Sequence, residues 1–333
     1  MSVGIEQIAA LNAAERADIF RATAADVKIS EAAIEKDFWV CWALHRIFSD
    51  AELSKQLLFK GGTSLSKCYG LIERFSEDID LILDWELLID EDPYLERSNT
   101  QQDRFNKKME LDAQVYVQGQ LIGQFNALMS DHCTFQMATV ADKPRSIMMT
   151  YPKAFTSTYI KPEIELEIGP MSGMTPNSMV IIKPYCQEVV KNVFGATELT
   201  VRAIEAKKTF WDKITILHTE AHRPEDRNQP ARYSRHYYDI FQMLNSIVVE
   251  EAMADLSLLA EVVAFKHKFY PQGWANYEGA VIGTFRLIPE QFRIDSLRND
   301  YAQMEEMIFG DYPSFDAILQ AVAGFEKKLN SSQ

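Results

Sequence analysis

The sequence predicts an α+β protein, in which a mixed sheet with flanking helices is followed by a mainly helical C-terminal domain. Two observations support this fold class. Short apolar runs bounded by turn residues occur at 56–83 and 159–168, as expected for strands. From about residue 200 onward, apolar residues recur at helical spacing. We expect residues 1–185 to hold N-terminal helices and the sheet, and residues 186–333 to form a helical domain that completes a cleft.

The chain of 333 residues is acidic, with a formal net charge of −14 and 47% hydrophobic residues. This composition allows sizeable cores, and the negative charge argues against broad, non-specific binding to nucleic acid. The four cysteines lie scattered without a CxxC motif, which predicts reduced thiols in a cytoplasmic protein. We expect neither a signal peptide nor a membrane span, because no basic region precedes an apolar run and no apolar stretch is long enough.

Residues 5–50 are predicted to form helices, with Ser30 as the N-cap of a core helix that includes Trp39 and Trp42. The charged triplet 35–37 (Glu-Lys-Asp) follows this cap. Acidic side chains are favourable near a helix N-terminus, so a solvated first turn is the default expectation. The alternative is that the triplet supports the neighbouring stretch 56–83.

The stretch 56–83 combines a turn with a pair of acidic residues. Gly61-Gly62-Thr63-Ser64 follows an apolar run and precedes a predicted helix, so its backbone N–H groups and hydroxyls suit an anion. Further along, Asp78 and Asp80 lie on one face of an extended strand, because side chains alternate between faces. Two adjacent carboxylates repel each other unless a cation lies between them, and Mg²⁺ with a phosphate substrate is the natural occupant.

A third carboxylate is expected from a later strand. After a helix at about 100–129, strands are predicted at 132–140, 146–151 and 159–168. In the last of these, Glu163, Glu165 and Glu167 share one face, which by itself would suggest a solvated acidic surface. Considered with the two aspartates, the pattern favours a site. Glu167 is the preferred third carboxylate, and Glu165 is the alternative on the same face.

Basic residues outnumber acidic ones between positions 202 and 239, which is a reversal in so acidic a chain. The reversal predicts a local positive surface that could face a triphosphate or an RNA backbone. The alternative is ordinary helix surface with pairing between Glu and Lys side chains.

Four motifs carry a resemblance to a known family. A GGTS turn followed by SEDID resembles the signature of the nucleotidyltransferase superfamily, and predicts a nucleotidyltransferase-like sheet. The four motifs KGGTSLSK, RFSEDIDLIL, FWDKITILH and RHYYDIFQML together resemble the AbiEii family, the nucleotidyltransferase-like toxins of type IV toxin–antitoxin systems. The resemblance extends roughly from residue 36 to residue 244, and more loosely over the C-terminal helices.

The resemblance implies a set of site residues. Asp78, Asp80 and Glu167 would bind Mg²⁺ and act in catalysis, and the family's later Lys and Asp are matched by Lys213 and Asp239. Asp239 could orient Lys213 or accept a proton from the acceptor; alternatively, it is only a structural partner of Arg235 at helical spacing. The candidate nucleotide-binding residues are Lys60, Gly61, Gly62, Thr63, Ser64, Lys67 and Arg235.

The implied activity is Mg²⁺-dependent transfer of a nucleotide from an NTP to an acceptor, which we expect to be the 3′ end of an RNA such as tRNA. The protein would be a cytoplasmic toxin of a phage-defence system. Its antitoxin would be separately encoded and would form no stable complex with it. Two alternatives remain: the same chemistry on a protein or small-molecule acceptor, and a nucleotide-binding regulatory protein without turnover.

Overall fold

The computed structural model describes the chain except for residues 1–3, 77, 141, 158–159, 192–197 and 332–333. The chain divides into two compact units. The first comprises residues 1–68 and 75–204, and the second comprises residues 69–74 and 205–333. The division therefore falls after residue 204 and not after residue 185 as expected, because the strand that ends at residue 204 belongs to the sheet of the first unit.

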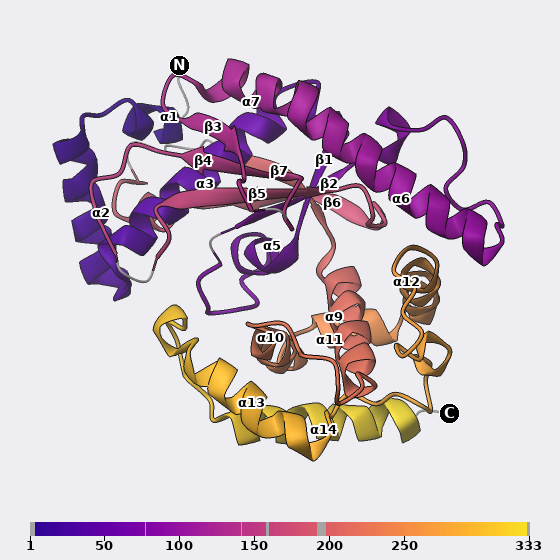
Figure 1. Cartoon of the computed structure of the whole chain (residues 1–333). Coiled ribbons are helices and arrows are strands. Elements are labelled where there is room, and N and C mark those ends of the chain that lie inside the picture. The colour runs from indigo at the N-terminus through magenta and orange to yellow at the C-terminus, as the bar shows by residue number, and fades with distance from the viewer. Residues whose placement is uncertain (1–3, 77, 141, 158–159, 192–197, 332–333) are drawn as a thin grey trace. The chain divides into compact units, whose positions relative to one another are not determined.

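A mixed, seven-stranded sheet forms the centre of the first unit within the described residues, and it confirms the predicted fold class (Figure 1). In spatial order the strands are β3 (Thr134–Met137), β4 (Ser146–Thr150), β5 (Glu163–Gly169), β2 (Ile79–Leu83), β1 (Leu57–Lys60), β7 (Leu199–Ile204) and β6 (Asn177–Ile182). β2 is parallel to β5 and β1 is parallel to β7, whereas the other neighbouring pairs are antiparallel.

The three strands expected between residues 132 and 168 are present as β3, β4 and β5. β5 begins later than expected, at Glu163, and Tyr159 lies outside the described residues. β6 was not predicted. The expectation of helix from about residue 200 is wrong for residues 200–204, which form β7 and pair with β1 and β6.

Helices accompany the sheet of the first unit. They are α1 (Gly4–Ala9), α2 (Ala13–Val27), α3 (Glu31–Ser49), α4 (Leu53–Gln56), α5 (Gly61–Lys67), α6 (Asn99–Tyr116) and α7 (Ile122–Met129), with the π-helical η2 (Val117–Leu121) and the 3₁₀ turns η1 (Trp85–Leu87) and η3 (Tyr185–Glu188). The segment from α6 through η2 to α7 forms one long rod beside the sheet, as predicted for residues 100–129 (Figure 1).

The helix α3 supplies much of the core of the first unit. Its N-cap is Ser30, whose side chain accepts a hydrogen bond from the backbone N–H of Ala33, as predicted. Phe38, Trp39 and Trp42 are completely buried in the core. Burying aromatic side chains of this size contributes strongly to stability. The position of α3 therefore determines which of its polar residues face the interior.

The expectation that residues 35–37 form a solvated turn is wrong. Glu35, Lys36 and Asp37 are all buried, at 1%, 0% and 4% exposure. Each charge has a partner, since buried charges are costly without one. The ammonium of Lys36 donates to the carbonyl of Lys161 at 3.1 Å, and Asp37 pairs with Lys67 of α5 at 2.6 Å. The alternative expectation, that the triplet supports the stretch 56–83, is confirmed by this pairing.

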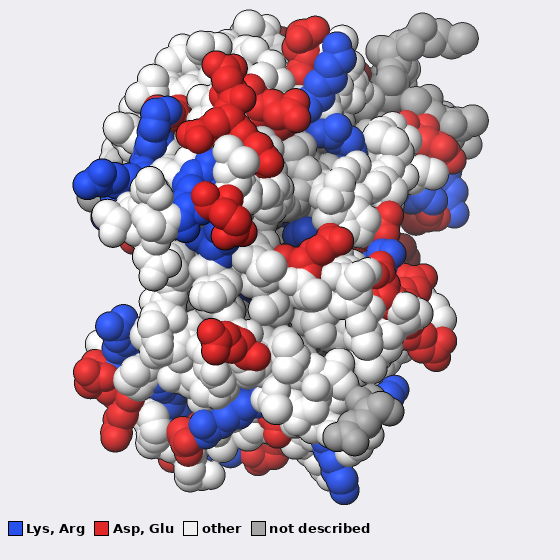
Figure 2. Space-filling view, turned by 90° about the vertical axis from the view of Figure 1, so that its right-hand side faces the viewer, with Lys and Arg blue, Asp and Glu red and all other residues white. Residues whose placement is uncertain are grey.

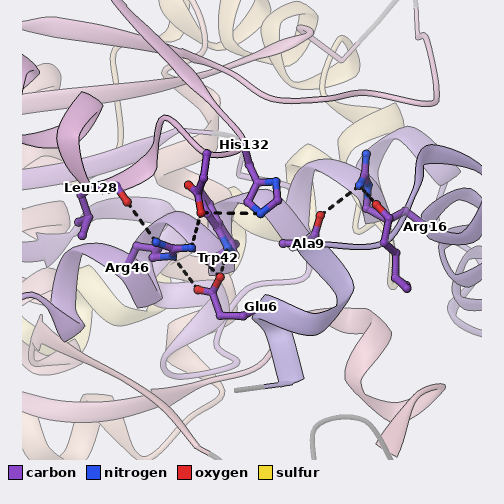
Figure 3. A network of polar contacts seen from close by, with 9 residues as sticks. Glu6, Ala9, Arg16, Trp42, Arg46, Leu128 and His132 are labelled. Atoms are coloured by element: carbon purple, nitrogen blue, oxygen red, sulfur yellow. Dashed lines mark hydrogen bonds and ion pairs between the residues drawn. The ribbon is translucent and has the colours of Figure 1, made fainter. Parts of the chain in front are cut away.

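A polar network around Arg46 joins three helices of the first unit, α1, α3 and α7 (Figure 3). The guanidinium of Arg46 on α3 donates to both carboxylate oxygens of Glu6 on α1, at 2.7 and 2.8 Å. It also donates to Asp131 at 2.7 Å and to the carbonyl of Leu128 at 3.1 Å. The indole of Trp42 adds a bond to Glu6. One arginine thus fastens α1 and the end of α7 to the core helix.

The second unit is helical, as predicted for the C-terminal part of the chain. Its helices are α9 (Ala206–Ala221), α10 (Ser234–Leu244), α11 (Val248–Met253), α12 (Leu256–Phe269), α13 (Gln291–Ala302) and α14 (Phe315–Ser331), with the 3₁₀ turns η4 (Tyr277–Gly279) and η5 (Glu305–Met307). α9 packs against α10, α11 and α12, while α10 also packs against α13 and α14. Of the helices described in either unit, none is both long and apolar enough to cross a membrane.

Candidate active site

The sheet of the first unit brings two predicted carboxylates together. In the parallel pairing of β2 with β5, Asp80 lies directly opposite Glu167. Cross-strand partners of this kind have neighbouring side chains on one face of the sheet. Loss of hydration, followed by repulsion from the Asp80 carboxylate, raises the pKa of Glu167. The pair therefore has the electrostatic character expected of carboxylates that share a cation.

The glycine turn lies against this pair. Lys60, the last residue of β1, is opposite Asp80 in the antiparallel pairing of β1 with β2. The next residue, Gly61, has a φ of 83°, in the left-handed region that favours glycine. A Cβ atom on Gly61 would lie 1.9 Å from Oδ2 of Asp80, so the carboxylate occupies the space that a side chain would need. The turn and the aspartate are thus in direct contact.

The hydroxyls of the turn have partners inside the protein. Thr63 is 1% exposed, and its hydroxyl donates to the carbonyl of Asp78 and lies 2.9 Å from the hydroxyl of Ser76. The hydroxyl of Ser64, which is 0% exposed, donates to the carbonyl of Gly61 at 2.9 Å. Thr63 therefore holds the segment that leads into β2, which positions Asp78 and Asp80. The predicted phosphate contact through these hydroxyls stays a prediction.

Lys67, predicted to bind nucleotide, is buried at the end of α5. Its ammonium lies 2.6 Å from a carboxylate oxygen of Asp37 and 3.9 Å from the centre of the Tyr185 ring. The side chains of Lys67 and Asp37 are 7% and 4% exposed. These contacts account for the lysine as the internal partner of Asp37, so we leave it out of the proposed nucleotide site.

Sequence reasoning missed Lys143, which lies between β3 and β4. Its ammonium is 2.7 Å from both carboxylate oxygens of Glu165 on β5. Burial alone would raise the pKa of Glu165, but hydrogen bonds from Lys143 and Ser146 outweigh it and lower this pKa. Glu165, the alternative third carboxylate, is therefore already paired. The sequence around Glu165 did not indicate this pairing, because Lys143 belongs to a loop of unremarkable composition.

The second unit brings together Lys213 and Asp239, as the resemblance implied, and adds Arg74. Asp239 is completely buried, and its carboxylate accepts bonds from Arg74 at 2.7 and 2.9 Å and forms an ion pair with Lys213 at 2.8 Å. Burial would raise the pKa of Asp239, but the two cations outweigh it and hold this pKa well below its usual range. The ion pairs described for Asp239 are with these two residues, so the alternative of a pairing with Arg235 is not what the structure shows.

These contacts distinguish between the two roles considered for Asp239. A carboxylate whose pKa is held low by two cations is a poor proton acceptor at neutral pH. It is well suited to fix the position of a lysine. Lys213 is 6% exposed, its pKa is lowered by burial, and it also lies 3.5 Å from Nδ1 of His236. The geometry favours Asp239 as the residue that orients Lys213. Arg74 stands within the motif RFSEDIDLIL, which was the available signal for it.

The expected positive surface between residues 202 and 239 is largely neutralised. Lys208 pairs with Asp212, Arg223 pairs with Glu220, and Lys207 lies near both Glu205 and Asp255. The alternative of ordinary pairing is thereby confirmed for these residues. On the face drawn in Figure 2, basic residues lie scattered among acidic and uncharged ones.

The carboxylate face, formed by Asp80 and Glu167 on neighbouring strands, has the oxygen ligands that a metal ion needs. Within the described part of the chain, no three His, Cys, Asp or Glu side chains are gathered as a metal site. Mg²⁺, however, is usually held by one or two carboxylates, and waters and substrate phosphates complete its shell. Asp80 and Glu167 supply oxygen ligands of this type. Their negative charges repel each other, as expected for two carboxylates that bind one cation. The residues therefore fit Mg²⁺ as a two-carboxylate site, and the three-ligand set with Asp78 stays a prediction.

A mixed sheet with a glycine turn against paired carboxylates is the arrangement of a nucleotidyltransferase, the class that the motifs suggested. Residues 42–321, which are most of the chain, match the family described as "Nucleotidyl transferase AbiEii toxin, Type IV TA system". The chain belongs to this family of nucleotidyltransferase toxins. Among solved structures, it is similar to MenT4, a nucleotidyltransferase toxin from Mycobacterium tuberculosis H37Rv, with 14% identity, a TM-score of 0.40, and coverage of 93% of this chain and 96% of that chain. No curated protein matches.

Proposed function

We propose that this toxin transfers a nucleotide from an NTP to the 3′ end of an RNA, such as a tRNA, and that the reaction depends on Mg²⁺. The observation that supports the metal-dependent step is the register of Asp80 with Glu167 beside Gly61, in a member of a nucleotidyltransferase family. Bound Mg²⁺ would neutralise charge on the attacking and leaving oxygens of a displacement at the α-phosphorus. The protein's own contribution is then mainly to position and to neutralise.

We assign roles to the residues on this basis. Asp80 and Glu167, with Asp78 beside them, hold the cation. Glu167 also accepts the proton of the acceptor hydroxyl, a role supported by its raised pKa. The backbone of Gly61 and Gly62, together with Lys60, faces the phosphates in this proposal. These assignments place the binding of metal and phosphate on one face of the sheet.

The charged residues that the family motifs place in the second unit have their own proposed roles. Lys213 and Arg235 are phosphate-binding cations, and Asp239 orients Lys213 through the ion pair at 2.8 Å. Arg74 holds both carboxylate oxygens of Asp239 and so fixes the orientation of this carboxylate. We also propose that the toxin acts in the cytoplasm against phage infection, and that its antitoxin is separately encoded and forms no stable complex with it.

The test is a labelling assay. Purified protein with Mg²⁺, total cell RNA and each NTP carrying a label at the α-phosphate should label RNA, and Asp80→Ala should reduce this to background. Asp84→Asn is the matched control, since it removes one negative charge just beyond β2 and can still cap η1 through its side-chain oxygen. Labelling that survives in Asp80→Ala would remove Asp80 from the metal site.

The same assay distinguishes the alternatives. Label recovered in protein or in a small molecule would support the same chemistry on another acceptor. Tight NTP binding without pyrophosphate release from any acceptor would support a regulatory protein without turnover. Growth after induction of the wild type beside Asp80→Ala tests toxicity, because only a catalytic toxin should lose its effect with this substitution.

A further inference from the structure

We propose that Lys143 is a positioning residue that occupies Glu165 and thereby leaves Glu167 as the carboxylate that joins Asp80 at the cation. This inference rests on the proposed function, because it concerns the same carboxylate face. It assigns a role to a residue outside the motifs that identify the family. It also explains why two glutamates on one strand face would have different roles.

The first step is the contact itself. Lys143 lies at 2.7 Å from both oxygens of Glu165, so one ammonium spans the whole carboxylate. The Glu165 side chain is 5% exposed, whereas that of Lys143 is 38% exposed. A carboxylate buried to this extent needs a cationic partner or a metal, because the uncompensated charge would be costly. Lys143 fills that need from within the chain.

The second step is how the loop is held. The segment that carries Lys143 is tied to β5 at more than one point. Arg145 donates through Nε to the carbonyl of Ile168 at 3.2 Å, and its own carbonyl accepts from the N–H of Ile168. Ser146 then pairs with Glu167 in the ladder of β4 with β5. Contacts to Glu167 and Ile168 therefore hold the segment that carries Lys143 against β5.

The third step is the charge on the face. Asp80, Glu165 and Glu167 lie on β2 and β5, and Asp78 lies directly before β2. The negative charges of Glu165, Asp78 and Glu167 all raise the pKa of Lys143. If Glu165 were free, it would stand two residues from Glu167 on the same face and could compete for the cation. The ion pair removes it from that competition. Among the ion pairs of the described residues, none involves Glu167, so its carboxylate stays available opposite Asp80.

The experiment measures metal binding directly. Mn²⁺ serves as the probe, and its dissociation constant is determined for each full-length variant by titration followed by electron paramagnetic resonance. Lys143→Met should bind Mn²⁺ about tenfold more tightly, because the substitution removes a nearby positive charge and releases a carboxylate. In the labelling assay, the Mg²⁺ concentration for half-maximal activity should fall while the maximal rate decreases, since Glu165 draws the ion away from its place opposite Asp80.

Three further variants separate positioning from stability. Lys143→Arg keeps the charge and the two-oxygen contact, so its Mn²⁺ affinity should match that of the wild type. Lys143→Met combined with Glu165→Gln removes the released charge and should restore wild-type Mn²⁺ affinity. Lys107→Met removes a lysine from an exposed ion pair on α6, where Lys107 and Asp103 side chains are 74% and 55% exposed, and should change nothing.

The outcomes distinguish the proposals from each other. A lower melting temperature with unchanged Mn²⁺ affinity in Lys143→Met would reduce Lys143 to a structural residue and overturn the inference alone. Absence of Mn²⁺ binding in the wild type would overturn both the metal dependence and the role of Lys143. If Lys143→Met impairs folding, one more variant, Glu165→Gln alone, still decides. It leaves the Lys143 charge uncompensated near the cation and should bind Mn²⁺ more weakly than the double variant, whereas equal affinities in these two variants would overturn the inference.

Discussion

Replacement of Gly61 by alanine tests the candidate site through the geometry of its backbone. At a φ of 83°, an alanine would occupy a conformation that L residues rarely adopt. Its Cβ would also lie 1.9 Å from Oδ2 and 2.7 Å from Cγ of Asp80. Neither contact is possible without a shift, so the Asp80 carboxylate or the turn must move. Gly61→Ala therefore acts on the proposed metal ligand without changing its chemistry.

The size of the effect follows from two contributions. Left-handed backbone at a non-glycine residue costs about 1–2 kcal/mol. Overpacking a filled site costs a further 1–3 kcal/mol or so. The free energy of unfolding should therefore fall by about 2–5 kcal/mol. Because a displacement on the order of 1 Å can cost about 10²-fold in rate, labelling by the folded variant should fall by about that factor.

The measurement combines urea unfolding with the labelling assay. Gly70→Ala is the matched control, because Gly70 has a φ of 59° and no atom lies within 4 Å of the position of its Cβ. It should lose about 1–2 kcal/mol and keep its activity. In an Asp80→Ala background, the cost of Gly61→Ala should fall towards this same value. Equal stability losses in Gly61→Ala and Gly70→Ala, with normal labelling in both, would refute the proposed contact between the turn and Asp80.

Two further predictions concern ion pairs that the structure buries. Asp239→Asn should lower the free energy of unfolding by about 3–5 kcal/mol at pH 7, because Arg74 and Lys213 lose their partner. The pKa of Asp239 is lower in the folded state than in the unfolded state. The stability that its ion pairs contribute is therefore fully present above the unfolded pKa of about 4 and is lost as the pH falls below it. A stability difference between Asp239→Asn and the wild type that stays undiminished at pH 3 would contradict this prediction. Lys67→Met should also cost about 3–5 kcal/mol while leaving the KM for NTP unchanged, whereas Lys107→Met, which breaks an exposed pair, should cost less than about 1 kcal/mol. A raised KM in Lys67→Met would restore the nucleotide-binding role predicted from its motif.

Local patterns predicted the part of the site that lies within one short stretch. The strand β1, the turn at Gly61, the helix α5 and the strand β2 follow one another between residues 57 and 83, so alternation and turn residues were sufficient to place them. Glu167 was found for the same reason, because period-two alternation identifies the face of a strand. Its register with Asp80 could not be derived in this way. Register depends on which strands pair, and β2 pairs with a strand more than 80 residues further along the chain.

The residues that sequence reasoning misjudged are those whose partners lie far away in the chain. Lys36 bonds to a carbonyl 125 positions further on, and Asp37 accepts from a backbone N–H 148 positions further on. In the sequence, buried charged side chains near the start of a helix cannot be distinguished from solvated ones. Helix geometry alone does not determine which part of the protein covers the helix. β7 was misjudged for a related reason. It lies directly before α9, and its pairing with β1 outweighs the local helical pattern.

Asp239 shows why a matched motif does not by itself determine a role. At the level of sequence, an aspartate four residues after an arginine on a helix is consistent with a proton acceptor, an orienting group or a helix-surface pair. The structure adds Arg74, which precedes Asp239 by 165 positions and holds both oxygens of its carboxylate. With Lys213 also in contact, the carboxylate is compensated by two cations, and its pKa is displaced away from the range useful for proton transfer. The same residue type in the same motif thus becomes an orienting group through a partner that no local pattern identifies, and Lys143 assigns Glu165 its role on the carboxylate face in the same way.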